Sequence, residues 1–149
     1  MENSITWMLI ADASKARLYA MHKARFMREQ HPNNLSLIQD FTHQNSRKKN
    51  ADLVTDKMGN YGPGSFTLPY VPKTHEAEVF AKELMNHLEG ERKNGSSFRD
   101  IILVAPPEFM GHLHHQTPSS ISKLITQKIE KDYTQDEGIT LVNKLIKHF

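Results

Sequence analysis

The sequence Ile101-Ile102-Leu103-Val104-Ala105-Pro106-Pro107 decides the fold, because it is the most apolar run in the chain and two prolines terminate it. A short apolar run bounded by such breakers is typical of a strand that is covered on both faces. The run Ile5-Thr6-Trp7-Met8-Leu9-Ile10-Ala11, which Asp12 stops, has the same character. Together the two runs predict the buried centre of a sheet.

Two further strands are predicted ahead of any convincing helix. Residues Ala16–Met21 alternate, with Ala16, Leu18 and Ala20 on one side, and Leu35–Phe41 follows a cluster of breakers at 31–34. The connection Asp12-Ala13-Ser14-Lys15 has the length of a hairpin turn. The favoured role for Asp12 is to close this turn with its own side chain. The alternative is a carboxylate in a cleft, because strand ends in such sheets border ligand crevices.

The longest helix is predicted to begin near His75, with Thr74 as its cap, and to end before Asn94-Gly95. Its apolar residues recur at steps of three and four and form one buried stripe. These residues are Ala77, Phe80, Ala81, Leu84 and Leu88.

The remaining elements follow the apolar run at 101–105. A shorter helix is predicted over Glu108 to His115, and Thr117-Pro118 supplies a cap and first-turn proline for another. Residues Ile125 to Lys131 are ambiguous between helix and strand. Strand is favoured, with Ile125, Gln127 and Ile129 on one face. Thr134-Gln135-Asp136-Glu137 has the pattern of a capping box that opens the last helix.

This order of elements predicts an α/β fold, namely a mixed β-sheet flanked by helices within a single domain spanning 1–149. We expect the core to include Trp7, Leu9, Phe80 and Leu103. The length of 149 residues fits one domain of ordinary size.

Composition narrows the possible classes of protein. The chain has 19 Lys and Arg against 17 Asp and Glu, which excludes a nucleic-acid-binding protein driven by net charge alone but allows a local basic patch. It has no cysteine, and therefore no disulfide or thiolate chemistry. No apolar run is long enough for a membrane-spanning helix, and Met1 to Asp12 does not resemble a secretory signal. A cytoplasmic location without membrane insertion is expected.

The periodic pattern disappears from Thr42 to Pro72, apart from one possible short helical turn at 50–57. This stretch of 42–72 contains glycines, prolines, basic residues and aromatic residues, and we expect it to be the functional surface. A run of basic residues is more often part of a solvated loop, and a surface that contacts RNA is the alternative. The candidate binding residues are Arg47, Lys48, Lys49, Lys57, Gly59, Gly62 and Gly64.

Patterns for catalysis or cofactor binding are incomplete. His112, His114 and His115 share a short segment, but no nearby carboxylate completes a zinc site, so no metal and no cofactor is predicted. The stretch Gly62-Pro63-Gly64-Ser65-Phe66 matches neither a nucleophile elbow nor a phosphate-binding loop. No catalytic residue is assigned.

Several segments, taken in order, resemble the host-attachment protein family, bacterial proteins described as required for attachment to host cells. They cover nearly the whole chain, and the ordered set is more specific than any one of them. The resembling segments are residues 7–18, 52–57, 75–78 with Phe80-Ala81, 103–111 and 131–134.

The resemblance implies a fold and a set of partners. The family is similar to the middle domain of archaeal and eukaryotic peptide-chain release factors and of Pelota, a mixed sheet flanked by helices with ribonuclease H-like topology. In release factors a Gly-Gly-Gln loop ahead of the long helix promotes hydrolysis of peptidyl-tRNA on the ribosome. The matching stretch here, Gly59 to Ser65, has neither adjacent glycines nor a glutamine.

Two classes of function follow from these observations. The favoured class is a non-enzymatic binding protein of the host-attachment family that associates with RNA or the ribosome, with host-cell contact implied by the family alone. The alternative is a release-factor-like hydrolase that acts on peptidyl-tRNA. The missing Gly-Gly-Gln disfavours the hydrolase.

Overall fold

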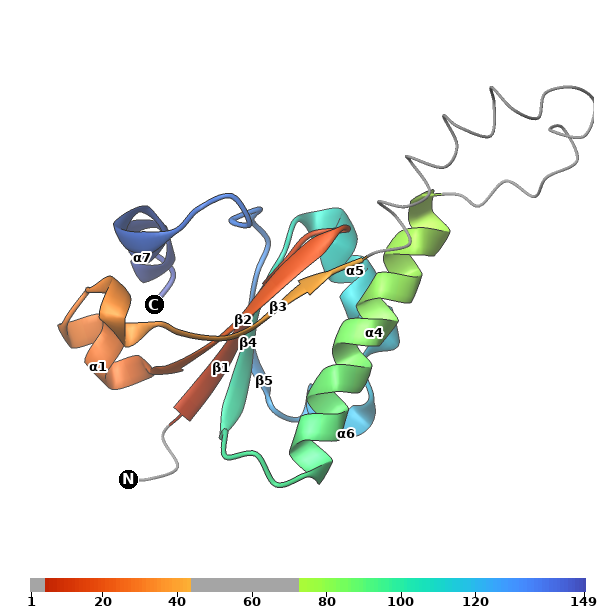
Figure 1. Cartoon of the computed structure of the whole chain (residues 1–149), viewed down its shortest axis with the longest axis horizontal. Helices are drawn as coiled ribbons and strands as arrows, with labels where there is room; N and C mark the ends of the chain where they lie inside the picture. Colours follow the sequence, from red (N-terminus) through yellow and green to blue (C-terminus); the bar gives the residue numbers. More distant parts are fainter. Residues whose placement is uncertain (1–4, 44–72) are drawn as a thin grey trace, which may run out of the picture.

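A five-stranded sheet with helices on both faces forms the part of the chain that the computed structural model describes, residues 5–43 and 73–149 (Figure 1). The strand order is β3-β2-β1-β4-β5. The first three strands are antiparallel neighbours, whereas β1, β4 and β5 run parallel, which is the predicted ribonuclease H-like arrangement. The strands are β1 Ile5–Ala11, β2 Lys15–His22, β3 Ser36–Thr42, β4 Asp100–Val104 and β5 Ile125–Ile129.

The central strand β1 is buried on both faces, which explains why almost all its residues are apolar. Leu9 lies opposite Leu18 of β2 and Leu103 of β4, and all three belong to one core cluster. The preceding residue, Met8, lies opposite Tyr19 of β2 and belongs to the core cluster on the other face of the sheet. Successive strand residues point to opposite faces, so a strand covered on both sides needs an unbroken apolar run.

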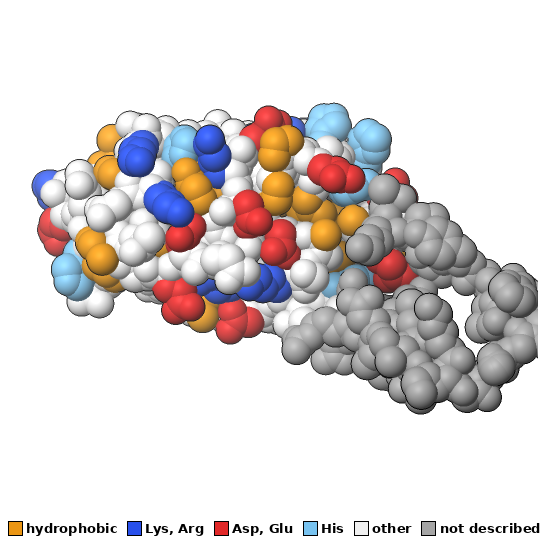
Figure 2. Space-filling model, turned by 90° about the horizontal axis from the view of Figure 1, so that it is seen from above, with side chains coloured by type: hydrophobic (Ala, Val, Ile, Leu, Met, Phe, Trp, Pro, Cys, Tyr) orange, Lys and Arg blue, Asp and Glu red, His pale blue; other side chains and the backbone are white. Residues whose placement is uncertain are grey.

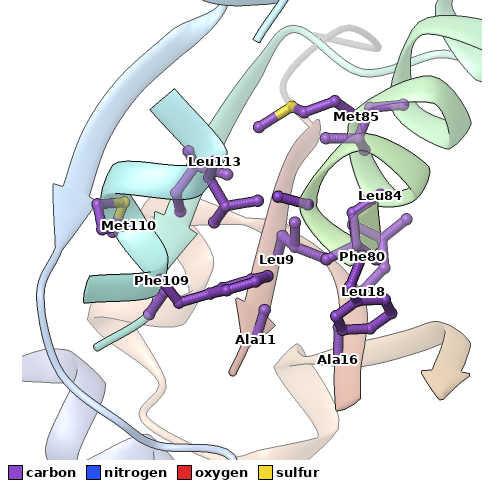
Figure 3. Close-up of a cluster of buried hydrophobic side chains, with 14 of the residues drawn as sticks. Leu9, Ala11, Ala16, Leu18, Phe80, Leu84, Met85, Phe109, Met110 and Leu113 are labelled. Carbon is purple, nitrogen blue, oxygen red and sulfur yellow. The ribbon is translucent and has the colours of Figure 1, made fainter. Parts of the chain in front are cut away.

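One face of the sheet is covered by α4 Lys73–Lys93, α5 Pro107–Gln116 and α6 Ser119–Ser122. In Figure 3 the apolar side chains of α4 and α5 converge on those of β1 and β2. The predicted helix stripe is therefore confirmed, and Trp7, Leu9, Phe80 and Leu103 are all buried as expected.

The other face is covered by α1 Lys23–Arg28 and α7 Gly138–Ile146, and η1 Pro32–Asn34 precedes β3. Phe26 of α1 meets Phe149 edge to face, with ring centroids 5.7 Å apart. Arg17 of β2 reaches across to the segment before α7, where its guanidinium donates to the carbonyls of Tyr133, Thr134 and Asp136. This side chain thus anchors the segment before α7 to β2.

The predicted strands and the two longer helices are confirmed, with bounds shifted by a few residues. The helix expected from His75 begins at Lys73, so Thr74 lies in its first turn and the prediction of Thr74 as the cap is wrong. The helix ends at Lys93, as expected. Gly95 follows with φ +86, a left-handed conformation that favours glycine.

The predicted caps of the two short C-terminal helices are also wrong. The capping residue of α7 is Glu137, which makes no side-chain cap bond, and the hydroxyl of Thr134 bonds to Asp132 instead. Pro118 occupies the capping position of α6, while the Thr117 hydroxyl donates back to the Leu113 carbonyl. In both cases a neighbouring acceptor outside the predicted motif captures the hydroxyl.

Strand β5 is present as predicted, but its residues do not share one face. The register shifts between Ile101 and Ile102, which pair with Ile125 and Gln127 respectively. Ile125 therefore packs on the cluster under α4 and α5, whereas Ile129 belongs to the cluster under α7. A bulge reverses the face of the sheet to which the following residues point. Strict alternation along the sequence therefore does not predict their faces.

Candidate functional site

The β1–β2 turn lies at the carboxyl end of the central strand, and Asp12 builds it. The Asp12 carboxylate accepts hydrogen bonds from the backbone N–H groups of Ser14 at 2.8 Å and Lys15 at 2.9 Å. The Asp12 N–H donates to the Lys15 carbonyl at 2.9 Å. The turn-closing role predicted for Asp12 is therefore confirmed.

The second carboxylate oxygen of Asp12 faces the chain before α7. It lies 3.0 Å from the hydroxyl oxygen of Thr134, which is itself 2.6 Å from a carboxylate oxygen of Asp132. Thr134 is one of the few buried polar residues of the described chain. Because one hydroxyl carries one proton, the two carboxylates share a single donor. This contact joins two segments that lie 122 residues apart.

A cavity of about 420 Å³ opens beside this turn. Its wall combines the turn itself with the N-terminal parts of α4 and α5, at the ends of β1 and β4. Strand ends of this kind commonly border ligand crevices. The wall is formed by residues 12–14, Ala77, Pro106, Glu108, Phe109 and His112.

The cavity wall is apolar with a few ionisable groups at its rim. Ala77, Pro106 and Phe109 supply the apolar part, while Asp12 and Glu108 supply carboxylates. His112 Nδ1 lies 3.9 Å from a carboxylate oxygen of Glu78 on α4. The Ser14 hydroxyl contacts Asp12 at 3.4 Å, and within the described residues no histidine lies within hydrogen-bond distance of it. A concave wall of apolar side chains with a few polar groups is typical of ligand pockets.

A buried histidine ties the end of β3 to α4 close to this cavity. His43 is only 1% exposed, and its Nε2 lies 2.9 Å from a carboxylate oxygen of Glu76. Its Nδ1 lies 3.4 Å from Glu83, and its ring packs on Phe80 with centroids 5.2 Å apart. The His43 N–H donates to the Ser14 carbonyl at 2.9 Å, which links the β1–β2 turn to the same point. We call this set of contacts the His43 clasp.

The His43 clasp was not predicted from the sequence. His43 lies two residues after the predicted strand Leu35–Phe41, within the stretch interpreted as a loop, and nothing in its neighbours marks it as buried. The structure corrects this, because β3 extends to Thr42 and His43 is buried. Glu76, Phe80 and Glu83 stand at helical spacing and so share a face of α4. The available signal was this acidic–aromatic–acidic face, which needs a partner from elsewhere in the chain.

The basic and glycine residues proposed for the loop lie outside the described residues. They are Arg47, Lys48, Lys49, Lys57, Gly59, Gly62 and Gly64, all within 44–72. The short helical turn expected at 50–57 falls there too. On either side of this stretch, His43 and the first turn of α4 are held together by the clasp.

The three histidines of α5 do not converge on one point. His112 faces the cavity and Glu78, whereas His114 contacts Lys128 of β5 at 3.2 Å. The rings of His114 and His115 are 6.1 Å apart. In the part of the chain that the structure describes, no group of three or more histidine or acidic side chains is arranged to hold a metal ion.

The clearest electrostatic perturbation lies at the opposite end of α4 from the clasp. Glu89 accepts hydrogen bonds from Arg92 and from the Ser120 hydroxyl, which lower the pKa of its carboxyl to about 2. On β2, burial raises the pKa of the Tyr19 phenol, and the adjacent Arg17 partly opposes this. Both groups support the scaffold and lie outside the cavity wall.

None of the helices within 5–43 and 73–149 combines the length and the apolar character needed to cross a membrane. The helix α4 is the longest of those described, with 21 residues, and it carries charged residues along its length.

The sequence matches a family model and a relative from Rickettsia prowazekii. A family model described as "Protein required for attachment to host cells" matches residues 7–145. An "Uncharacterized protein RP470" from Rickettsia prowazekii (strain Madrid E) is 28% identical over 95 residues, which make up 62% of this chain and 61% of that protein. The chain thus aligns with less than two thirds of the length of this relative.

Solved structures with a similar fold include the crystal structure of the archaeal translation termination factor aRF1. It superposes with a TM-score of 0.50 and 9% identity over 96% of this chain and 33% of that one. A structure titled "Archaeal protein" gives a TM-score of 0.49, also at 9% identity, over 97% of this chain and 33% of that chain. At this identity the likeness to the termination factor concerns the fold alone, and the chain spans about a third of it.

Proposed function

Because the chain belongs to the family of proteins required for attachment to host cells, we propose that it is a non-enzymatic binding protein that associates with RNA or the ribosome. The binding element in this proposal is the stretch 44–72 together with the scaffold that holds its two ends. In this proposal the protein acts in the cytoplasm, and contact with host cells is implied by the family description alone.

The observation that carries the proposal is the His43 clasp. It fixes the residue before the stretch 44–72 to Glu76, in the first turn of the helix that follows it, through a buried contact of 2.9 Å. Binding residues are commonly carried on connecting segments that a rigid scaffold positions. The clasp, packed on Phe80 and bonded to the β1–β2 turn, provides such a base.

The distribution of charge supports a polyanionic partner. The stretch 44–72 has four basic and two acidic residues, whereas the rest of the chain has 15 of each. On the face shown in Figure 2, basic and acidic side chains are interspersed over the described surface. The stretch also contains Tyr61, Phe66 and Tyr70, and aromatic side chains provide stacking surfaces for unpaired bases. A locally basic segment with aromatic residues on a neutral scaffold suits RNA.

The alternative function is a hydrolase acting on peptidyl-tRNA, suggested by the likeness of the fold to a translation termination factor. The glycines of the stretch stand apart, at 59, 62 and 64, and no glutamine follows them. An amide side chain that would position water is therefore missing from the expected place. We expect hydrolysis of peptidyl-tRNA by the purified protein to stay at background.

The proposal is tested by sedimentation with ribosomes and by titration with RNA at several salt concentrations. The variant Arg47→Gln/Lys48→Gln/Lys49→Gln is expected to sediment less with ribosomes. Its RNA binding should also depend less on salt, because the slope of log binding constant against log salt concentration falls in magnitude by about 0.7 for each phosphate contact removed. Its melting temperature should change little, because the described core contains none of these three residues.

The matched control is Arg25→Gln/Arg28→Gln/Lys147→Gln, which removes three exposed charges from α1 and the end of α7. It should bind as the wild type does. Wild-type protein that stays at the top of the gradient at low salt would refute the association. Equal losses in the two triple variants would show that binding does not depend on the stretch 44–72.

A further inference from the structure

A second concave surface lies between the end of α5, the short helix α6 and the strand β5. It encloses about 660 Å³ and is separate from the cavity beside Asp12. We call it the α6 groove. Its polar lining residues are His114, Thr117, Ser119, Ser122, Lys123 and Lys128, and Ile125 supplies the apolar part. Cations and hydroxyl groups thus form its polar wall, and the residues that line it include no carboxylate.

The two lysines of the α6 groove keep their charge available. Lys128 Nζ lies 3.2 Å from His114 Nδ1. An ammonium group can only donate, so the imidazole accepts at Nδ1 and carries its own proton on Nε2. In the described part of the chain neither Lys123 nor Lys128 forms an ion pair with a carboxylate. Lys144, in contrast, binds Asp136 at 3.0 Å.

The hydroxyl groups of the groove divide into two sets. Thr117 donates to the Leu113 carbonyl and is satisfied within α5. Ser119 and Ser122 make no side-chain hydrogen bond to any described residue, so both hydroxyls are free to donate to a ligand. Two ammonium groups, an imidazole N–H and two hydroxyls are thus donors without a competing anion.

The backbone that carries these donors is anchored to the core. The Ser120 hydroxyl donates to Glu89 of α4 at 2.6 Å, and Ile121 is fully buried. The Leu124 carbonyl accepts from the Ile101 N–H of β4 at 2.8 Å. Lys123 therefore lies between two fixed residues, and Lys128 lies on a strand paired with β4. Side chains on an anchored backbone lose less conformational freedom on binding than side chains on a mobile loop.

We propose that the α6 groove binds phosphate groups, carried either by a small polyphosphate or by the backbone of a nucleic acid. Ammonium groups and hydroxyls in one concavity match the charge and the acceptor oxygens of phosphate. The groove uses no residue of 44–72, so this site is independent of the function proposed above. A variant could therefore lose binding at the α6 groove and keep binding through the stretch 44–72, or the reverse.

The site is tested by NMR titration of the ¹⁵N-labelled full chain, first with tripolyphosphate and then with a short oligouridylate at the same ionic strength. We expect the amide signals of Ser119, Ser122, Lys123 and Lys128 to shift with a saturable dependence on the probe. Tighter binding of tripolyphosphate would identify small polyphosphates as the source, and tighter binding of oligouridylate would identify nucleic acid. Absence of saturable shifts at these residues with both probes would overturn the proposal.

Lysine variants distinguish a specific phosphate site from nonspecific electrostatic attraction. Lys123→Gln/Lys128→Gln should weaken binding about tenfold for each lysine, or about 1.4 kcal/mol each at 25 °C. The control Lys131→Gln/Lys147→Gln removes two exposed lysines that lie outside the lining of the groove and should bind normally. Equal weakening in both pairs would refute a specific site. The variant Arg47→Gln/Lys48→Gln/Lys49→Gln should retain these shifts whatever its effect on ribosome binding.

Discussion

Replacing Leu103 with alanine tests the centre of the fold. Leu103 has no exposed surface and lies on β4 between Leu9 of β1 and Lys128 of β5. The change removes three buried carbon groups, worth about 0.8 kcal/mol each in transfer free energy. A cavity then adds to this cost, because strands on both sides of β4 limit collapse around it.

The expected loss is in the upper half of the range of about 2–5 kcal/mol that such truncations produce. The measurement is equilibrium unfolding in urea, with the free energy of unfolding compared at equal m-value. Leu37→Ala is the matched control, because Leu37 is 50% exposed on the edge strand β3 and should cost about 0.5 kcal/mol or less.

A third variant, Ile102→Ala, tests whether both faces of the sheet are covered. Ile102 is as buried as Leu103 but belongs to the cluster on the opposite face. We expect a loss comparable to that of Leu103→Ala. If the free energy of unfolding of Leu103→Ala is no lower than that of Leu37→Ala, the central position of β4 is refuted. If Ile102→Ala loses almost no free energy of unfolding, the second covered face is refuted.

Three other predictions concern the scaffold and its histidines. Arg17→Lys should destabilise by about 1–3 kcal/mol in urea unfolding, because the three carbonyls before α7 lose a shared donor, and an unchanged midpoint would contradict this. The lowered pKa of Glu89 means that its stabilising contribution is complete above about pH 4.5 and is lost as the pH falls toward 2. Thermal scans between pH 6 and pH 2 should therefore show a shallower acid loss for Glu89→Gln than for the wild type, and parallel curves would count against it. Elemental analysis of the purified protein should find no stoichiometric zinc, and about one zinc per chain lost in a His112→Asn/His115→Asn variant would overturn this.

The elements could be predicted from the sequence where a local pattern alone determines them. The runs at 5–11 and 101–105 are apolar throughout because both faces of their strands are covered. The stripe of α4 reflects helical spacing, and Gly95 stops the helix because it adopts a positive φ. Each of these features depends on neighbours within about one turn or one strand.

The features that could not be predicted depend on partners distant in the chain. Thr134 fits a capping box in sequence, but Asp132 and Asp12 compete for its hydroxyl, and Asp12 comes from the opposite end of the chain. The bulge at β5 arises from pairing with β4, so it has no signature within 125–129 itself. The His43 clasp requires β3 to end beside α4, which only the assembled sheet provides.

Asp12 both closes the β1–β2 turn and lines the cavity. The Asp12 carboxylate accepts hydrogen bonds from two backbone N–H groups of its own turn and from the Thr134 hydroxyl. These hydrogen bonds engage both carboxylate oxygens, so the side chain holds the turn closed and joins it to the chain before α7. Its position at the cavity follows from the same bonds, since the turn they close forms part of the wall. The residue therefore shapes the crevice and contributes negative charge to it, whereas the basic residues that suit a phosphate ligand lie in the α6 groove and in the stretch 44–72. A polyanion is accordingly expected to avoid the cavity beside Asp12 and to bind where carboxylates are absent from the wall.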